Sequence, residues 1–147
     1  MSSRSSSHKN SPLTPDPVRV IRGERARTRG ALGEDIAVAF LNSKGAQILH
    51  RNWRPKGAGV RGECDIVAQC DDIFCFIEVK TRQSSDFGEP QEAVDTAKRR
   101  QLERLARAWI ALHGDEQTLR FDIIEIWWGE NKNPRVAWIE GAFEIRI

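Results

Sequence analysis

Two short apolar runs separated by an acidic break are the sequence feature that most constrains the fold of this chain. The first run is Ile66–Cys70, the second is Ile73–Ile77, and Asp71-Asp72 stands between them. Both runs are rich in β-branched, aromatic and other apolar residues, and a short polar break between such runs is typical of a β-hairpin. The segment therefore predicts two antiparallel strands joined by a tight turn, and the rest of the fold must be arranged around them.

A turn centred on Asp71-Asp72 determines which residues face each other, because the numbers of facing residues then sum to 143. Asp65 is opposite Glu78, and Glu63 is opposite Lys80. Since residues two apart on a strand share a face, all four charged side chains are predicted on one side of the hairpin. The other side is predicted to be a core face, formed by Cys64, Ile66, Ala68, Cys75, Ile77 and Val79.

The facing pair Asp65 and Glu78 requires an explanation. Side chains directly opposite on paired strands have Cβ atoms ~4.5–5.5 Å apart, and like charges there are destabilising. A divalent cation between the carboxylates would remove the repulsion, and Mg²⁺ is commonly held by one or two carboxylates together with water and phosphate oxygens. In the other interpretation, one carboxylate pairs with Lys80 or an arginine and the charged face is only solvated.

The Glu-x-Lys spacing has little weight by itself. Glu130-Asn131-Lys132 repeats the spacing in a turn-like segment that has no apolar strand around it. For Glu78-Val79-Lys80, the surrounding apolar strand and the facing Asp65 are the features that indicate a site.

The remaining segments predict two helices and further strands. One helix is expected over about 30–44, ended by Gly45, and a longer one from Pro90 to about His113. Strands are expected over 48–53 and 119–128, with one or two more within 135–147. The order of one helix, three strands, one helix and two or three strands predicts an α/β fold in which helices flank a mixed sheet.

Each predicted helix has a charged residue in its inward stripe. Glu34 precedes Ala37, Val38 and Leu41 at helical spacing, which aims its carboxylate at the sheet. A first-turn glutamate favoured by the helix dipole is the other explanation, and the pattern alone favours it. The longer helix has the inward stripe Val94, Lys98, Leu102, Leu105, Trp109 and Leu112. Its Arg100, Arg104 and Arg107 share another face, for which solvation is a commoner explanation than phosphate contact.

Charge is spread unevenly along the chain. The net charge is +2, but residues 1–30 hold seven basic and two acidic side chains, which leaves −3 for the remainder. Residues 1–29 are predicted to be a disordered basic arm, because the segment is rich in Ser, Pro and other polar residues, and residues 30–147 to be one domain. The arm indicates a nucleic-acid tether or, in the other interpretation, a solubilising tail.

Several classes of protein do not fit the sequence. No apolar run approaches the ~18 residues of a membrane span, and the N-terminus lacks the apolar core of a secretory signal. The three cysteines have no Cys-x-x-Cys spacing, which predicts reduced thiols rather than a zinc site or a disulfide framework. A cytoplasmic setting is therefore expected. The five tryptophans indicate core or homodimer contacts more than stacking on bases.

Several short motifs follow one another in a fixed order over roughly residues 30–126. They are Gly33-Glu34-x-x-Ala37, Gly45, Asn52, Gly62-Glu63-x-Asp65-Ile66-Val67, Glu78-Val79-Lys80-Thr81-Arg82, Phe87-Gly88, Lys98 and Arg120-Phe121-Asp122. This pattern closely resembles the YraN family of uncharacterised bacterial proteins. That family is placed in the restriction-endonuclease-like, or PD-(D/E)xK, superfamily with archaeal Holliday-junction resolvases. The resemblance implies a restriction-endonuclease-like mixed sheet flanked by helices in the order α-β-β-β-α-β-β.

The resemblance also implies roles for individual residues. Asp65 and Glu78 match the metal-binding acids of the superfamily, and Lys80 matches its catalytic lysine. Glu34 matches the acidic residue of the first helix, which favours the inward-aimed carboxylate over the dipole explanation. Cys64 stands at the position of the proline in the superfamily's name, a position where proline is often missing.

These observations predict a metal-dependent phosphodiester hydrolase, an endonuclease-like enzyme acting on DNA, with branched or structured DNA among its substrates. The expected cofactor is Mg²⁺ or Mn²⁺, held by Asp65, Glu78, the backbone carbonyl of Val79 and Glu34, while Glu63 supports Lys80. Nucleic-acid contacts are expected from Arg25, Arg27, Arg29, Arg82 and Lys98. The alternatives are a non-catalytic nucleic-acid-binding module of the same fold and a protein-interaction scaffold.

Overall fold

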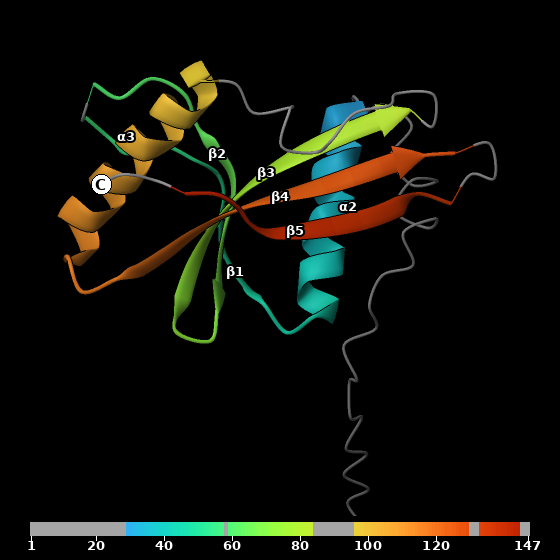
Figure 1. Ribbon diagram of the computed structural model, residues 1–147, viewed down its shortest axis with the longest axis horizontal. Helices are drawn as coiled ribbons and strands as arrows, with labels where there is room; N and C mark the ends of the chain where they lie inside the picture. The colour runs from blue at the N-terminus through green and yellow to red at the C-terminus, as the bar shows by residue number, and fades with distance from the viewer. Residues whose placement is uncertain (1–28, 58, 84–95, 130–132, 145–147) are drawn as a thin grey trace, which may run out of the picture.

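A five-stranded mixed sheet organises the structure (Figure 1). The computed structural model describes residues 29–57, 59–83, 96–129 and 133–144. Its elements are α2 (Arg29–Ser43), β1 (Gln47–Trp53), β2 (Cys64–Cys70), β3 (Ile73–Gln83), α3 (Thr96–His113), β4 (Thr118–Trp128) and β5 (Arg135–Phe143). The strands lie in the order β1-β2-β3-β4-β5. The predicted α/β class and the predicted order of elements are confirmed.

The predicted hairpin forms with the predicted register. β2 and β3 are antiparallel, and their pairs run from Ile66 opposite Ile77 to Cys70 opposite Ile73. Asp71 in the turn has a φ of 52°, a left-handed conformation that aspartate tolerates better than most residues. Continuing this register by one position brings Asp65 and Glu78 opposite each other at the end of the paired segment.

β3 is also the centre of the sheet, because its other edge pairs in parallel with β4. This pairing extends from Ile73 opposite Thr118 to Gln83 opposite Trp128. Parallel neighbours cannot be joined by a tight turn, and α3 lies in the connection between them. β1 and β5 form the two edges, each antiparallel to its neighbour.

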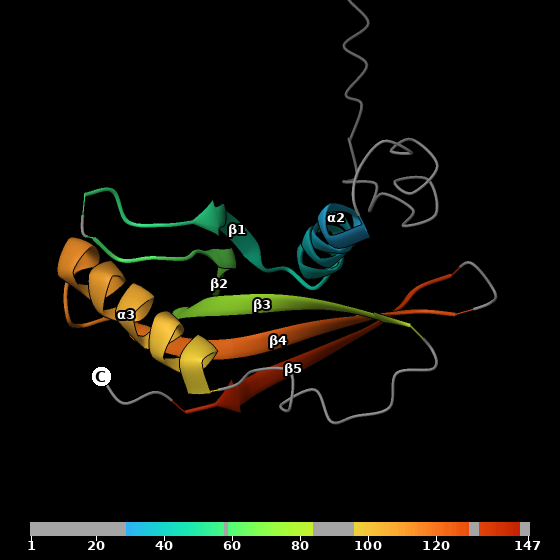
Figure 2. The ribbon, with the colours of Figure 1, turned by 90° about the horizontal axis from the view of Figure 1, so that it is seen from above.

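The two helices cover opposite faces of the sheet. Alternate strand residues point to opposite sides, so each face collects its own apolar cluster. The α2-side cluster contains Ile36, Ala37, Leu41, Ile66, Ala68, Cys75, Ile77, Ile124 and Ile126. The α3-side cluster contains Trp53, Cys64, Val67, Phe76, Leu102, Leu105, Ala106, Trp109, Phe121, Ile123 and Phe143. Figures 1 and 2 show that the helices also lie toward different ends of the twisted sheet.

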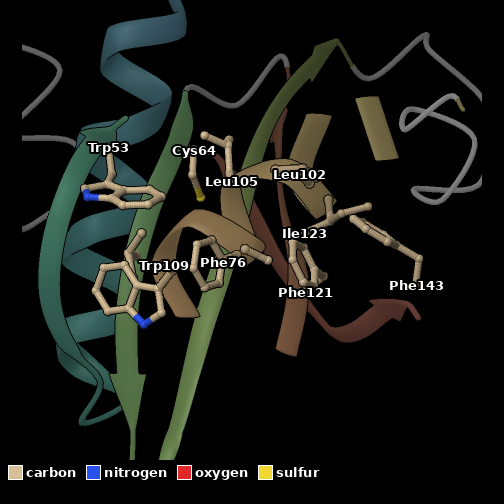
Figure 3. Packing of buried hydrophobic residues seen from close by; sticks show 11 residues of the cluster. Trp53, Cys64, Phe76, Leu102, Leu105, Trp109, Phe121, Ile123 and Phe143 are labelled. Atoms are coloured by element: carbon tan, nitrogen blue, oxygen red, sulfur yellow. The ribbon is translucent and has the colours of Figure 1, made fainter. Parts of the chain in front are cut away.

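Trp109 anchors α3 to the sheet (Figure 3). Its ring centroid lies 5.2 Å from that of Trp53 and 5.7 Å from that of Phe76, in edge-to-face arrangements. Aromatic pairs of this kind contribute ~0.5–1.5 kcal/mol beyond the burial of their area. The orientation of α3 on the sheet is therefore set by a packed aromatic contact.

Three details differ from the sequence prediction. Cys64 belongs to the α3-side cluster, because it begins β2 opposite Trp53, before the regular alternation of the hairpin. Leu112, predicted inward, is 65% exposed, and His113 instead stacks on the Trp109 ring. The charged face of the hairpin is apolar nearer the turn, where α3 covers it.

Other sequence predictions are confirmed or lie outside the described residues. The three cysteines are free, and Gly45 ends α2 with a φ of 85°. No helix in the described ranges is long and apolar enough to cross a membrane. Most of the predicted basic arm, including Arg25 and Arg27, and the predicted helix start at Pro90 lie outside the described residues. Arg29 begins the α2 backbone.

The close approach of α2 to β3 at Gly33 gives the first prediction. A Cβ at this position would overlap Thr81 Oγ1 and lie 3.6 Å from Ile126 Cδ1. Gly33→Ala is expected to lower the free energy of unfolding by about 1–3 kcal/mol, although alanine favours a helix by ~1 kcal/mol. Gly30→Ala is the matched control, since nothing lies within 4 Å of its Cβ position. Urea unfolding measures both variants, and equal effects would contradict the steric explanation.

Candidate functional site

The predicted acids come from three neighbouring elements, with Glu34 in α2, Asp65 in β2 and Glu78 in β3. Burial, and then the negative charge of Asp65, raises the pKa of both Glu34 and Glu78. A carboxylate that affects both neighbours must lie close to each of them. The structure therefore gathers the three acids around Asp65.

Glu78 is the most enclosed of the three, with a side chain only 4% exposed. Its burial and the repulsion from Asp65 raise the pKa of Glu78 from 4.5 to about 7, although Lys98 and Lys80 act in the opposite direction. The like-charge contact expected across the hairpin is thus present. The protein's own cations offset it only in part.

Asp65 is oriented by a backbone group of the facing strand. The Val79 N–H donates a hydrogen bond to Asp65 Oδ2 at 2.9 Å. This bond lies just beyond the last paired residues of the hairpin, Ile66 and Ile77. It orients the Asp65 carboxylate and also the peptide between Glu78 and Val79, next to the carbonyl predicted as a metal ligand.

Lys98 reaches the site from α3. Its Nζ lies 3.2 Å from Glu78 Oε1 and also donates to Gln101 Oε1 at 3.1 Å. Gln101 in turn donates through Nε2 to the carbonyl of Arg61 at 3.2 Å. Gly62 permits this approach, because its φ is 92° and a Cβ there would overlap Gln101 Nε2. Lys98, assigned to phosphate from the sequence, is therefore an ion-pair partner of Glu78.

Two other predicted residues have ion-pair partners of their own. Arg82 Nε lies 2.5 Å from Oε1 of Glu125, a fully buried carboxylate on β4. Glu63, predicted to support Lys80, instead pairs with Arg54 at 2.8 Å. Its place just before β2 explains this, because the regular pairing that would set it opposite Lys80 does not reach that far.

Residues around Glu34 include two that the sequence interpretation missed. Arg51 lies 2.7 Å from Asp35 Oδ1 and 3.9 Å from Glu34 Oε2. A side-chain hydrogen bond from Asn52 also favours the ionised form of Glu34, against the burial that raises its pKa. Asn52 has a φ of 50°, and asparagine tolerates that left-handed conformation. Its place in the motif order was the only signal available from the sequence.

The donor set fits a cation that needs few protein ligands. Within the described ranges, no group of three or more His, Cys, Asp or Glu side chains is arranged to hold a metal ion. Asp65 and Glu78 nevertheless provide two close carboxylates, and Mg²⁺ is usually held by one or two carboxylates with several waters. The residual repulsion on Glu78 would be relieved by such a cation.

An open pocket of about 300 Å³ lies at the other end of β3. It is lined by Lys44, Gly45, Ala46, Cys70, Asp71, Ile73, Arg120, Trp138 and Glu140. None of the predicted site residues contributes to it, so it is separate from the acidic site.

Comparison with known proteins identifies similar sequences. The model of the family described as "Uncharacterised protein family UPF0102" matches residues 33–126. A UPF0102 protein of Moorella thermoacetica is 43% identical over 121 residues, which is 80% of this chain and 96% of that protein. One from Solibacter usitatus is 38% identical over 126 residues, 85% of this chain and 92% of that protein. One from Rhodococcus jostii is 37% identical over 115 residues, 78% and 94% respectively.

The raised pKa of Glu78 gives a prediction for metal-free protein. The pKa of Glu78 in the folded protein is about 7, which exceeds the ordinary value of 4.5. Below pH 4.5 the carboxyl group is protonated in both the folded and the unfolded state, so it does not penalise folding. Stability is lost as the pH rises from there toward and through 7. Glu78→Gln removes this loss, so its stability relative to the parent should improve by up to about 1 kcal/mol at alkaline pH. Urea unfolding in EDTA at about pH 5 and about pH 8 measures the difference. Glu116→Gln, at an exposed position, is the control, and a Glu78→Gln variant less stable than the parent at both pH values would contradict the assignment.

The Lys98–Glu78 pair gives a second prediction. Lys98→Met leaves the buried carboxylate without its ion-pair partner, which should cost about 1–3 kcal/mol of unfolding free energy at alkaline pH. The double variant Lys98→Met/Glu78→Gln should recover part of that loss, because no buried charge then remains to be compensated. Urea unfolding of the parent, both single variants and the double variant measures the coupling. Additive effects on the free energy of unfolding would show that Lys98 and Glu78 are not energetically coupled.

Proposed function

The chain belongs to the uncharacterised protein family UPF0102, and we propose that it is a metal-dependent phosphodiester hydrolase acting on DNA. This is the YraN family, which the order of motifs in the sequence indicated. The observation that carries the proposal is the buried Glu78 carboxylate, which lies beside Asp65 with Lys80 on the same strand face. A strongly perturbed acid beside a second acid is typical of functional sites.

Asp65 and Glu78 would hold Mg²⁺ or Mn²⁺, with the Val79 carbonyl as a third protein oxygen and Glu34 contacting the ion directly or through water. Such an ion, when bound, polarises a phosphate oxygen and lowers the pKa of a coordinated water. The hydrogen bond from the Val79 N–H keeps Asp65 oriented for this role. Lys98 holds the Glu78 side chain through an ion pair at 3.2 Å.

Lys80 would act on the substrate. It lies two residues after Glu78 on β3, so the two side chains share a face of the strand. Its ammonium group is compact, and it would stabilise negative charge on the phosphate oxygens and orient the attacking water. The acids and the lysine together provide ligands, orientation and charge stabilisation for cleavage of a phosphodiester.

A non-catalytic nucleic-acid-binding module is the second candidate function. The observation in its favour is that Lys98 already gives Glu78 a cationic partner without any metal. In such a module the carboxylates would have a structural role, and neither a metal nor Lys80 would promote cleavage of a bound phosphodiester.

Metal-dependent stability and cleavage separate the two candidates. The parent should be stabilised by Mn²⁺, by about 2.7 kcal/mol at one hundred times the Kd, because binding to the folded state shifts unfolding by mass action. Asp65→Asn should largely lose this effect while keeping an oxygen for the Val79 N–H. Lys80→Met should retain metal stabilisation but lose cleavage. Thermal melts with and without Mn²⁺ measure the metal-dependent stabilisation. Incubation with a panel of linear, flapped and four-way DNA measures cleavage. A parent indifferent to Mn²⁺ in both assays would favour the binding module.

A further inference from the structure

We propose that Trp127 is a stacking platform for an unpaired base of a DNA strand, on the sheet face that carries Glu78 and Lys80. Arg82 and Arg135 flank it, and these two arginines with Trp127 are called the stacking row. The inference rests on the proposed function and deepens it, because it assigns a part of the substrate beyond the phosphate that is cleaved.

The register of three strands brings the stacking row together. Arg82 on β3 is opposite Trp127 on β4 in the parallel pairing, and Trp127 is opposite Arg135 on β5 in the antiparallel pairing. Side chains of directly paired residues project from the same face of a sheet and are close neighbours. The tryptophan therefore has an arginine beside it on each neighbouring strand.

The stacking row lies on the same face as the proposed catalytic residues. Glu78, Lys80 and Arg82 alternate along β3, so they share a face. The ion pair of Arg82 Nε with Glu125 Oε1 at 2.5 Å shows that β4 presents Glu125, and Trp127 two residues later, to that face. Four residues separate Glu78 from Arg82, which is ~13 Å at ~3.3 Å per residue. Lys80 is halfway between the acidic site and the row.

The helix that covers this face runs away from the stacking row. α3 meets the face through Lys98, 3.2 Å from Glu78 Oε1. Farther along α3, the Trp109 ring centroid lies 5.7 Å from those of Phe76 and Phe74, nearer the hairpin turn. Figure 2 shows β3 and β4 extending past α3 at the other end. α3 therefore leaves the end of the face that carries the row uncovered.

Trp127 differs from the other four tryptophans in its packing. Trp53 and Trp109 belong to the α3-side cluster, and Trp128 and Trp138 pack against the α2-side cluster. Trp127 belongs to neither of the clusters that the described residues form, and it is partly exposed. A core role, expected for the tryptophans from the sequence, therefore fits those four. Proteins that bind single strands combine such accessible rings with cations that follow the backbone.

The two arginines of the row have different roles. Arg82 is held by the buried Glu125 carboxylate, which fixes its guanidinium group beside the tryptophan. Arg135 is exposed and has no ion-pair partner among the residues that the structure describes. Arg135 can therefore contact a phosphate without leaving a buried acid behind. The row thus provides a ring for a base and a free guanidinium for the adjoining phosphate.

This combination selects an unpaired strand. Bases within a duplex already stack on their neighbours, and taking one out of the stack costs a few kcal/mol. An unpaired base has a free face for the ring of Trp127. The ~13 Å between the row and Glu78 corresponds to about four stacked base steps of ~3.4 Å. The substrate class is therefore DNA in which the strand becomes unpaired within a few nucleotides of the cleaved phosphate, as in a flap.

The test compares binding of the full chain to a short oligodeoxythymidine strand and to a DNA duplex of the same length, in EDTA. Trp127→Leu should weaken binding of the single strand by ~5–150-fold, the loss of one stacked base, and leave duplex affinity nearly unchanged. Trp128→Leu is the matched control, because it removes the neighbouring ring from the opposite face. It should leave both affinities unchanged, and thermal melts verify that both variants are folded.

Two further measurements separate stacking from charge. Arg135→Gln should reduce the slope of log affinity against log salt for the single strand by ~0.7, the value for one phosphate, whereas Trp127→Leu should leave the slope unchanged. Trp127→Phe retains a ring and should keep most of the affinity. Quenching of tryptophan fluorescence by the single strand should be largely lost in Trp127→Phe, a readout that does not depend on the leucine variant.

Equal losses on single strand and duplex in Trp127→Leu, equal losses in the two leucine variants, full quenching in Trp127→Phe, or no binding of the single strand by the parent would each overturn the inference. Thermal melts with Mn²⁺ keep this result separate from the metal site. Trp127→Leu should retain the metal-dependent shift of the parent, because the ring is not a ligand. A parent without that shift whose single-strand binding still depends on Trp127 would refute the proposed hydrolase while supporting the stacking platform.

Discussion

The parallel pairing of β3 with β4 is the constraint on which the rest of the structure depends. The two strands are paired through eleven successive positions, whereas the pairing of β3 with β2 ends at Ile77. A parallel pair requires the chain to cross over one face of the sheet, and α3 lies in that crossing. The opposite face is then left for α2. The second half of β3 consequently continues without β2 beside it, and this is the segment that carries Glu78, Lys80 and Arg82.

Two buried carboxylates, Asp122 and Glu78, show how differently the fold compensates negative charge. Asp122 accepts hydrogen bonds from Nε and a terminal nitrogen of Arg120, from Trp138 Nε1 and from the Gly141 N–H, all at 2.8–2.9 Å. The bonds to Asp122 also raise the pKa of the Arg120 guanidinium. That set saturates the carboxylate and ties β4 to β5, which is a structural role. Glu78 pairs with Lys98 but also has a neighbouring acid and a raised pKa, which is a strained arrangement rather than a saturated one.

The hairpin and the helices were predictable because their signals are local. The apolar runs and the acidic turn determined the register that brings Asp65 opposite Glu78, and the glycine after α2 determined its end. The ion pairs were not predictable, because they join residues far apart in the chain. Lys98 stands in the apolar stripe of its helix and was assigned to phosphate, and only the packing of α3 identifies its partner as Glu78. Arg82 and Glu125 are a similar case, since they come from neighbouring parallel strands whose pairing the sequence does not specify.

The charges around the acidic site link the two ligands that the proposed function requires. Three acids, Glu34, Asp65 and Glu78, meet at the site, and Lys98 and Lys80 offset the repulsion on Glu78 only in part. A divalent cation would relieve this repulsion, but it would also place further positive charge beside the two lysines. A phosphate group supplies negative charge at the same place, so each ligand should favour the other, and by linkage the effect is reciprocal.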